Sequence, residues 1–114
     1  MTEIYHNPRC SKSRQTLAVL EAEGISPTVI EYLKTPPTQE TLSGLLSMLG
    51  MTPRELLRKG EAVYKELNLK DTTLSDEALL TAMIENPKLI ERPIVVHNGK
   101  AAIGRPPESV LSLF

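Results

Sequence analysis

The chain has a single cysteine, Cys10, and the residues around it have the clearest capacity for chemistry. Arg9, Lys12 and Arg14 place three positive charges within four residues of Cys10, and His6 lies four residues upstream. Such neighbours, together with the unpaired amides at the start of a helix, stabilise a thiolate and lower its pKa. A lone cysteine is often buried packing. The polar and cationic flanks favour the other interpretation, a reactive thiolate.

The spacing Cys10-x-x-Ser13 resembles the C-x-x-C signature of redox proteins, with serine in place of the second thiol. A serine at this position can donate a hydrogen bond to the thiolate, but it cannot resolve a mixed disulfide. Because no other cysteine exists, a redox cycle must take its further thiols from outside the chain. One cysteine and two histidines also give no metal site, and His97 is expected at the surface.

Three arginines distant in sequence could complete an anion site: Arg58, Arg92 and Arg105. Arg92 precedes the first strand of a predicted hairpin, and Arg105 follows the second. These two positions meet at the same end of a hairpin, so we expect Arg92 and Arg105 to be neighbours. The alternative for each arginine is a solvated surface position.

The first third of the chain predicts a strand, a helix and a second strand. Residues 3–5 and 28–32 have strand character, and residues 12–23 favour a helix that ends at Gly24. A helix that joins two such strands makes them parallel. The apolar stripe of the helix is predicted to comprise Leu17, Ala18, Leu20 and Ala22.

A helical insert is predicted over about residues 38–86. Its helices begin at Thr38, at the capping box of Thr52 and at Ser75, with a weaker helix over 61–67. The helix after Thr52 is expected to include Leu56, Leu57 and Arg58, and the last helix should end at Asn86-Pro87. The inward faces are expected to carry Leu42, Leu45, Leu46, Leu49, Leu79, Leu80, Met83 and Ile84.

The C-terminal region contains the strongest hairpin signal. Residues 94–97 and 100–103 flank the turn dipeptide Asn98-Gly99. A last helix should then turn Val110, Leu111 and Phe114 inward. The order βαβ, helical insert, ββα predicts an α/β fold with a four-stranded mixed sheet.

Composition limits the possible functions. A chain of 114 residues with 40% hydrophobic and 24% charged residues indicates one globular domain, 1–114. No apolar run is long enough to span a membrane, and no leader precedes the first strand, so we expect a cytoplasmic protein without a membrane partner. A net charge of -1 argues against non-specific nucleic-acid binding.

Five segments carry a more specific likeness: 4–14 (IYHNPRCSKSR), 32–37 (YLKTPP), 56–59 (LLRK), 92–96 (RPIVV) and 104–106 (GRP). In this order and spacing they resemble the glutaredoxin-dependent arsenate reductase family, the ArsC-like branch of the thioredoxin-like superfamily. The resemblance covers nearly the whole chain. It implies a thioredoxin-like fold with a helical insert.

The resemblance also implies roles for individual residues. Cys10 corresponds to the nucleophile, and His6 to the histidine that helps to activate it. Pro93 corresponds to the proline that is cis in thioredoxin-like folds. Arg58, Arg92 and Arg105 correspond to three catalytic arginines that hold the oxyanion and stabilise charge in the transition state. The start of the first helix is also expected to bind the oxyanion, through Ser11, Lys12, Ser13 and Arg14.

The implied reaction reduces arsenate to arsenite through a thioarsenate on Cys10. Glutathione and glutaredoxin serve as external thiols, and no cofactor or metal is bound. Two other functions on the same fold remain open. One is a redox-sensing regulator that binds RNA polymerase, although such regulators typically carry a C-x-x-C pair. The other is a monothiol oxidoreductase that acts on glutathione mixed disulfides.

Overall fold

The computed structural model describes all 114 residues, which form two compact units. The first unit consists of Met1–Thr35 and Arg92–Phe114, and the second of Pro36–Glu91. The second unit contains the whole of the predicted insert, 38–86, and extends it by a few residues at each end.

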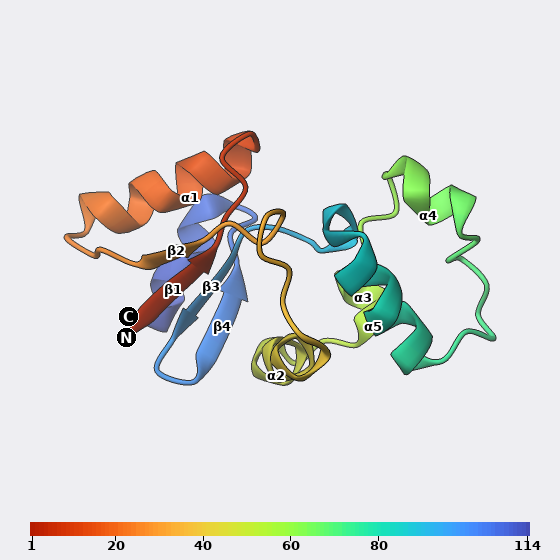
Figure 1. Cartoon of the computed structure of the whole chain (residues 1–114). Coiled ribbons are helices and arrows are strands. Elements are labelled where there is room, and N and C mark those ends of the chain that lie inside the picture. The colour runs from red at the N-terminus through yellow and green to blue at the C-terminus, as the bar shows by residue number, and fades with distance from the viewer. The chain divides into compact units, whose positions relative to one another are not determined.

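A four-stranded mixed sheet forms the centre of the first unit (Figure 1). Its strands are β1 (Thr2–Tyr5), β2 (Thr28–Ile30), β3 (Ile94–His97) and β4 (Lys100–Ile103), in the order β2-β1-β3-β4. β1 is parallel to β2, whereas β3 is antiparallel to both β1 and β4. The predicted mixed sheet is therefore confirmed, with β2 two residues shorter than expected.

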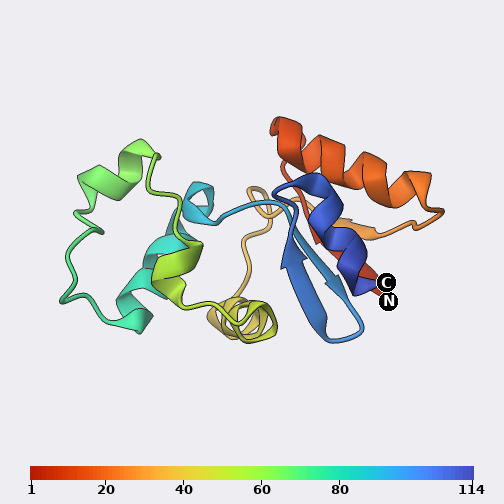
Figure 2. The same ribbon diagram turned by 180° about the vertical axis from the view of Figure 1, so that it is seen from behind.

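Two helical segments pack on this sheet (Figure 2). α1 spans Ser11–Ala22, and the 3-10 helix η2 spans Pro107–Leu113; they contact each other, and η2 also contacts β4. Their shared core is aliphatic and fully buried: Ile4, Leu20, Val95 and Val110. Burying such a side chain stabilises a fold by about 1.5–3 kcal/mol, so these residues fix α1, and with it Cys10, against the sheet.

The inward face of α1 differs from the predicted stripe. Ala18 and Ala22 are exposed, and the buried positions are Ser13, Thr16 and Leu20. Ser13 and Thr16 are small and hydrogen-bonded, which allows them to be buried without an unsatisfied hydroxyl. An apolar pattern alone could not identify them.

The C-terminal residue is also placed differently from the prediction. Val110 is buried as expected, but Phe114 is 48% exposed. Its ring packs on the ring of His97, with centroids 4.3 Å apart. His97 in turn hydrogen-bonds Thr2, with 2.8 Å between Nδ1 and Oγ1.

The predicted hairpin is confirmed. Asn98 and Gly99 have φ values of 49° and 78°, the positive pair that a two-residue type I′ turn requires. The turn pairs His97 with Lys100 and Ile94 with Ile103. Arg92 and Arg105 therefore extend from the same end of the hairpin.

The second unit is helical and contains α2 (Gln39–Leu49), α3 (Pro53–Leu56), α4 (Ala62–Glu66), α5 (Asp76–Glu85) and the 3-10 helix η1 (Pro87–Leu89). α5 packs against α2, α3 and η1. The predicted caps are confirmed: Thr38, Thr52 and Ser75 each accept a backbone N–H in the first turn, and Thr52 forms a complete capping box. None of the helices in either unit is long and apolar enough to cross a membrane.

The helix after Thr52 is shorter than predicted. It ends at Leu56, and Leu57 forms an isolated antiparallel bridge with Ile90. The N–H of Arg58 donates to the carbonyl of Leu89 at 2.8 Å. Arg58 thus lies in an extended segment beside η1. The sequence predicted only that a helix ends at Asn86-Pro87 and did not predict the 3-10 turn η1 there.

Candidate active site

Cys10 is the N-cap residue of α1. Its backbone is extended, and its carbonyl accepts the N–H of Arg14 at 3.0 Å. The amides without a partner within the helix are therefore those of Ser11, Lys12 and Ser13, whereas that of Arg14 is already bonded. Cys10 is partly exposed, so its thiol is accessible at the positive end of the α1 dipole.

The pKa of the Cys10 thiol is lowered. Partial burial opposes ionisation, but it is outweighed by a hydrogen bond from Arg92, the N–H of Ser13, the charge of Arg92 and the N–H of Lys12. The direction agrees with the sequence prediction, but the cause differs. The stabilising charge comes from Arg92, which precedes the hairpin, rather than from the flanking Arg9, Lys12 and Arg14.

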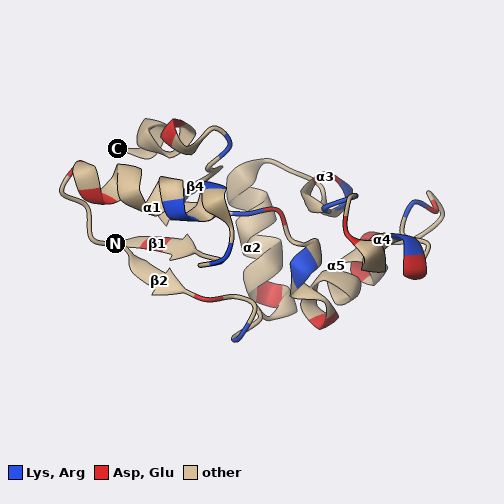
Figure 3. Ribbon diagram, turned by 90° about the horizontal axis from the view of Figure 1, so that it is seen from above, with Lys and Arg blue, Asp and Glu red and all other residues tan.

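Arg105 is the second cation at the thiol. Its Nη2 lies 3.8 Å from Cys10 Sγ, and its Nε donates to the carbonyl of Arg92 at 2.8 Å. The prediction that Arg92 and Arg105 are neighbours is confirmed. Figure 3 colours the Lys and Arg positions of the ribbon blue, and several segments of the first unit carry blue positions near the start of α1. The peptide bonds Arg92–Pro93 and Arg105–Pro106 are both cis, the first as the resemblance implies.

His6 is connected to the thiol indirectly, through Ser13. His6 Nδ1 lies 2.6 Å from Ser13 Oγ, and the N–H of Asn7 donates to the same hydroxyl at 3.0 Å. Burial lowers the pKa of His6, the charge of Glu31 opposes this, and Arg14 adds to the lowering. The Ser13 hydroxyl is therefore bound to His6 and Asn7, and it is the backbone N–H of Ser13 that stabilises the thiolate.

Asn7 organises the loop before Cys10, a role that the sequence prediction missed. Its carbonyl accepts the N–H of Cys10 and its side-chain oxygen accepts the N–H of Arg9, both at 3.0 Å. The side chain of Arg14 closes the turn by donating to the carbonyl of Pro8 at 2.9 Å. The Asn-Pro dipeptide signals a turn, but its hydrogen bonds depend on the fold.

Three side chains around the helix start are exposed and make no contact with the thiol. Ser11, Lys12 and Arg9 all point into solvent without a hydrogen bond or ion pair. Lys12 contributes through its backbone N–H, which faces the thiol. The expected binding of an oxyanion by Ser11, Lys12, Ser13 and Arg14 stays a prediction.

Gly104 allows the hairpin to approach α1. A Cβ at this position would overlap the Thr16 hydroxyl and lie 2.9 Å from Cγ of Pro93. Thr16 donates to the carbonyl of Lys12 at 2.8 Å and lies 3.4 Å from that of Gly104. The absence of a side chain at Gly104 therefore sets the distance between Arg105 and the start of α1.

Arg58 belongs to the second unit and is held there by two acids. Its Nη1 lies 2.7 Å from Oε1 of Glu91, and its Nε lies 3.5 Å from Oε2 of Glu61. Neither glutamate was identified from the sequence. A role for Arg58 at the oxyanion stays a prediction.

The first unit places an accessible thiol beside several hydrogen-bond donors and positive charges. This thiol of lowered pKa is bordered by the guanidinium groups of Arg92 and Arg105 and by the N–H groups of Lys12 and Ser13, which lack a partner within the helix; such donors suit an oxyanion. Across both units, no group of three or more His, Cys, Asp or Glu side chains is arranged to hold a metal ion.

A family model matches residues 5–113, and its description is the ArsC family. The chain belongs to the ArsC family. The Escherichia coli K12 protein YfgD, described as uncharacterized, is 62% identical over 112 residues, which are 97% of this chain and 94% of that protein. An arsenate reductase of Neisseria meningitidis serogroup A is 48% identical over 109 residues, or 95% and 93% of the two chains.

A solved ArsC structure shows the same fold. The arsenate reductase from Vibrio cholerae superimposes with a TM-score of 0.97 at 59% identity, covering 99% of this chain and 97% of the other. The predicted thioredoxin-like architecture is therefore confirmed.

Proposed function

We propose that this ArsC protein is an arsenate reductase that reduces arsenate to arsenite with glutathione and glutaredoxin as external thiols. The observation that carries the proposal is the Cys10 thiol, whose pKa is lowered by Arg92 and which lies 3.8 Å from Nη2 of Arg105. Names of relatives such as the arsenate reductase of Haemophilus influenzae, 47% identical over 112 residues, support the substrate.

The first step joins sulfur to arsenic. Arsenate is a doubly charged tetrahedral anion at neutral pH, so an anionic thiolate approaches it only where cations offset the repulsion. The guanidinium groups of Arg92 and Arg105 and the amides at the start of α1 supply that positive potential. Cys10 Sγ then forms a bond to arsenic, and an arsenate hydroxyl takes up a proton from solvent and leaves as water.

The second step reduces arsenic with two electrons. The thiolate of glutathione attacks Cys10 Sγ, and the electron pair of the sulfur–arsenic bond stays on arsenic, which leaves as arsenite. Cys10 is left in a mixed disulfide with glutathione. The thiolate of glutaredoxin attacks the glutathione sulfur and releases the Cys10 thiolate. This sequence is supported by the cysteine count, because a chain with one thiol cannot regenerate itself.

The remaining residues have supporting roles in this proposal. His6 and Ser13 position the amide that faces the thiolate, and Ser11, Lys12 and Arg14 add to the positive end of α1. Arg58 adds a third arginine for the transition state, and Pro93 shapes the loop beside Arg92. A cytoplasmic location follows from the need for a reducing thiol pool.

The direct test is arsenate-dependent oxidation of NADPH by the purified protein with glutathione, glutaredoxin and glutathione reductase. We expect saturable turnover that is lost in Cys10→Ser with its fold retained. Absence of arsenate-dependent turnover in the wild type would refute the assignment of arsenate as the substrate. Faster turnover of a glutathione mixed disulfide than of arsenate would instead support a monothiol oxidoreductase.

A further inference from the structure

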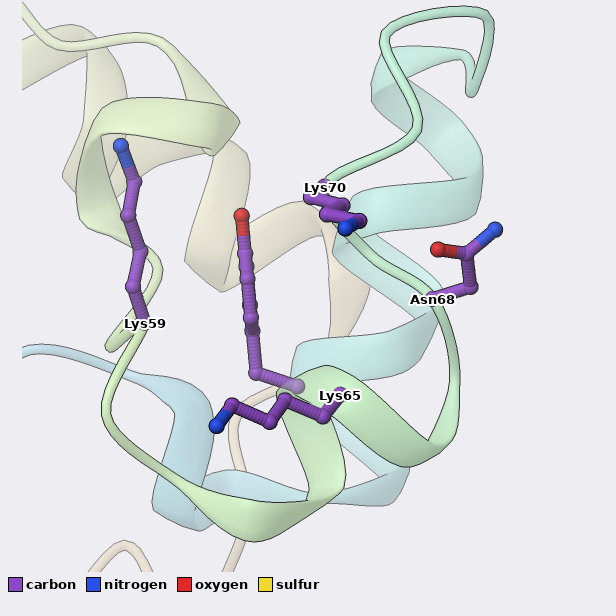
Figure 4. Close-up of a pocket in the computed structure, with 5 residues that line it drawn as sticks. Lys59, Lys65, Asn68 and Lys70 are labelled. Atoms are coloured by element: carbon purple, nitrogen blue, oxygen red, sulfur yellow. The ribbon is translucent and has the colours of Figure 1, made fainter.

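The second unit contains a hollow that plays no part in the chemistry of Cys10. It has a volume of about 360 Å³ and is lined by Lys59, Tyr64, Lys65, Asn68 and Lys70 (Figure 4). Small-molecule sites usually have volumes of about 300–1,000 Å³, so this hollow is large enough for a metabolite. Its lining includes three cations and no acid.

The three lysines come from three segments and have no acidic partner. Lys59 lies in the loop before α4, Lys65 within α4 and Lys70 in the loop after it, and none of them forms an ion pair. Of the acids nearest in sequence, Glu61 pairs with Arg58 and the carboxylate of Asp71 accepts two hydrogen bonds from Thr73. Glu66 follows Lys65 directly, but it is exposed and forms no ion pair with the lysines. The three lysines are exposed, and together they give the hollow a positive potential that attracts an anion.

Tyr64 is the second observation that points to a ligand. Tyr64 is only 9% exposed, yet it lines the hollow, and no other group of the protein hydrogen-bonds its hydroxyl. Its backbone is held on both sides, because its N–H donates to Glu61 and its carbonyl accepts from Leu69, both at 3.0 Å. This hydroxyl is not among the buried side-chain atoms that lack a partner, so it is accessible to solvent and available to an acceptor on a ligand.

We propose that this hollow binds a small organic diphosphate. Lysine binds phosphate as a point charge, whereas selective carboxylate recognition favours the planar fork of arginine. A phosphate monoester carries about -1.5 to -2 charges at neutral pH, so three ammonium groups exceed what one phosphate balances. Two linked phosphates match the three lysines, the Tyr64 hydroxyl donates to one of their oxygens, and the remaining volume accommodates an organic group.

The test is isothermal titration calorimetry of the full chain with inorganic pyrophosphate and with ADP. We expect one saturable site per chain and weaker binding of orthophosphate and AMP. Because a hydrogen bond to a charged group contributes about 1.5–3 kcal/mol, Lys65→Ala and Lys70→Ala should each weaken pyrophosphate binding about tenfold or more. Tyr64→Phe keeps the ring but removes the hydroxyl, and it should also weaken pyrophosphate binding. The matched control is Lys88→Ala, an exposed lysine of the same unit outside the hollow.

Binding at the Cys10 site must be separated from binding at this hollow. We expect Arg92→Ala to retain pyrophosphate binding and amide NMR shifts to fall within residues 59–70. Three outcomes would overturn the proposal: no saturable binding, equal losses in Lys88→Ala and Lys65→Ala, or loss of binding in Arg92→Ala. None of them depends on whether arsenate is reduced.

Discussion

The reactivity of Cys10 depends on a cation that is distant in sequence. Arg92 supplies both a hydrogen bond and a charge to the thiolate, whereas Arg9 is adjacent in sequence but exposed and without a contact to it. Removing a cation destabilises the anionic form, so Arg92→Ala should raise the pKa of Cys10 towards that of a free thiol. The pH at which iodoacetamide alkylation reaches half its maximal rate should therefore move upwards.

The same measurement on Arg9→Ala provides the control. This variant removes an equal charge from the residue next to Cys10, and its midpoint should stay near that of the wild type. A larger upward shift for Arg9→Ala than for Arg92→Ala would show that sequence neighbours, and not the hairpin, set the pKa.

The Ser13 hydroxyl is expected to matter for stability more than for nucleophilicity. It is fully buried and connects His6 Nδ1 to the N–H of Asn7. Ser13→Ala leaves both groups without this partner, which should lower the free energy of unfolding by about 1–3 kcal/mol in urea. Ser11→Ala, on an exposed serine of the same turn, should change it by less than about 0.5 kcal/mol. Equal effects of the two substitutions would contradict a structural role for the Ser13 hydroxyl.

At the scale of single residues, the sequence predicts which charged residues lie near the thiol better than it predicts their hydrogen-bond partners. Cys10, Arg92 and Arg105 were identified because hairpin topology brings two of them together and the helix start places the third. The hydrogen-bond partners of the Ser13 hydroxyl were not identified. A hydroxyl can bind either a thiolate or a histidine, and the choice depends on how the loop packs. Asn7 and Glu91 were missed for the same reason.

At the scale of elements, the contact between the hairpin and α1 depends on Gly104. A Cβ there would collide with Thr16 and approach Pro93, so Gly104→Ala should cost about 1–3 kcal/mol of unfolding free energy. It should also slow Cys10 alkylation, because Arg105 and the start of α1 are displaced. Both effects should be partly reversed by a second substitution, Thr16→Ala.

A second glycine in the chain provides the control. Gly44 lies within α2 with no atom within 4 Å of its would-be Cβ. Gly44→Ala should raise the unfolding free energy by about 0.5–1 kcal/mol, because alanine favours the helix. If Gly104→Ala were equally stabilising, the close approach at Gly104 would not constrain the fold.

The sequence identified elements whose signal is local. The capping box of Thr52, the caps of Thr38 and Ser75 and the Asn98-Gly99 turn depend on residues within three or four positions, and all were confirmed. The inward face of α1, the bridge at Leu57 and the exposure of Phe114 were predicted wrongly or missed. Each depends on a segment distant in sequence, so local periodicity could not reveal it.

At the scale of the whole molecule, the net charge of -1 conceals two cationic regions. One surrounds Cys10 with Arg92 and Arg105, and the other surrounds Tyr64 with three lysines. The acids that offset them are distributed elsewhere, several of them in ion pairs such as Glu31 with Lys34. An average charge near zero therefore excludes a uniformly basic surface but not specific anion sites.

The single cysteine leads to the last prediction, which concerns the stoichiometry of the whole chain. With arsenate and glutathione but without glutaredoxin, the proposed sequence stops at the mixed disulfide, because Ser13 cannot displace glutathione as a second thiol would. Intact-mass spectrometry should then show one glutathione per chain, removed when glutaredoxin is added. Cys10→Ser should acquire none. A chain that keeps turning over without glutaredoxin, or one that accumulates no adduct when arsenite is released, would contradict the proposed use of two external thiols.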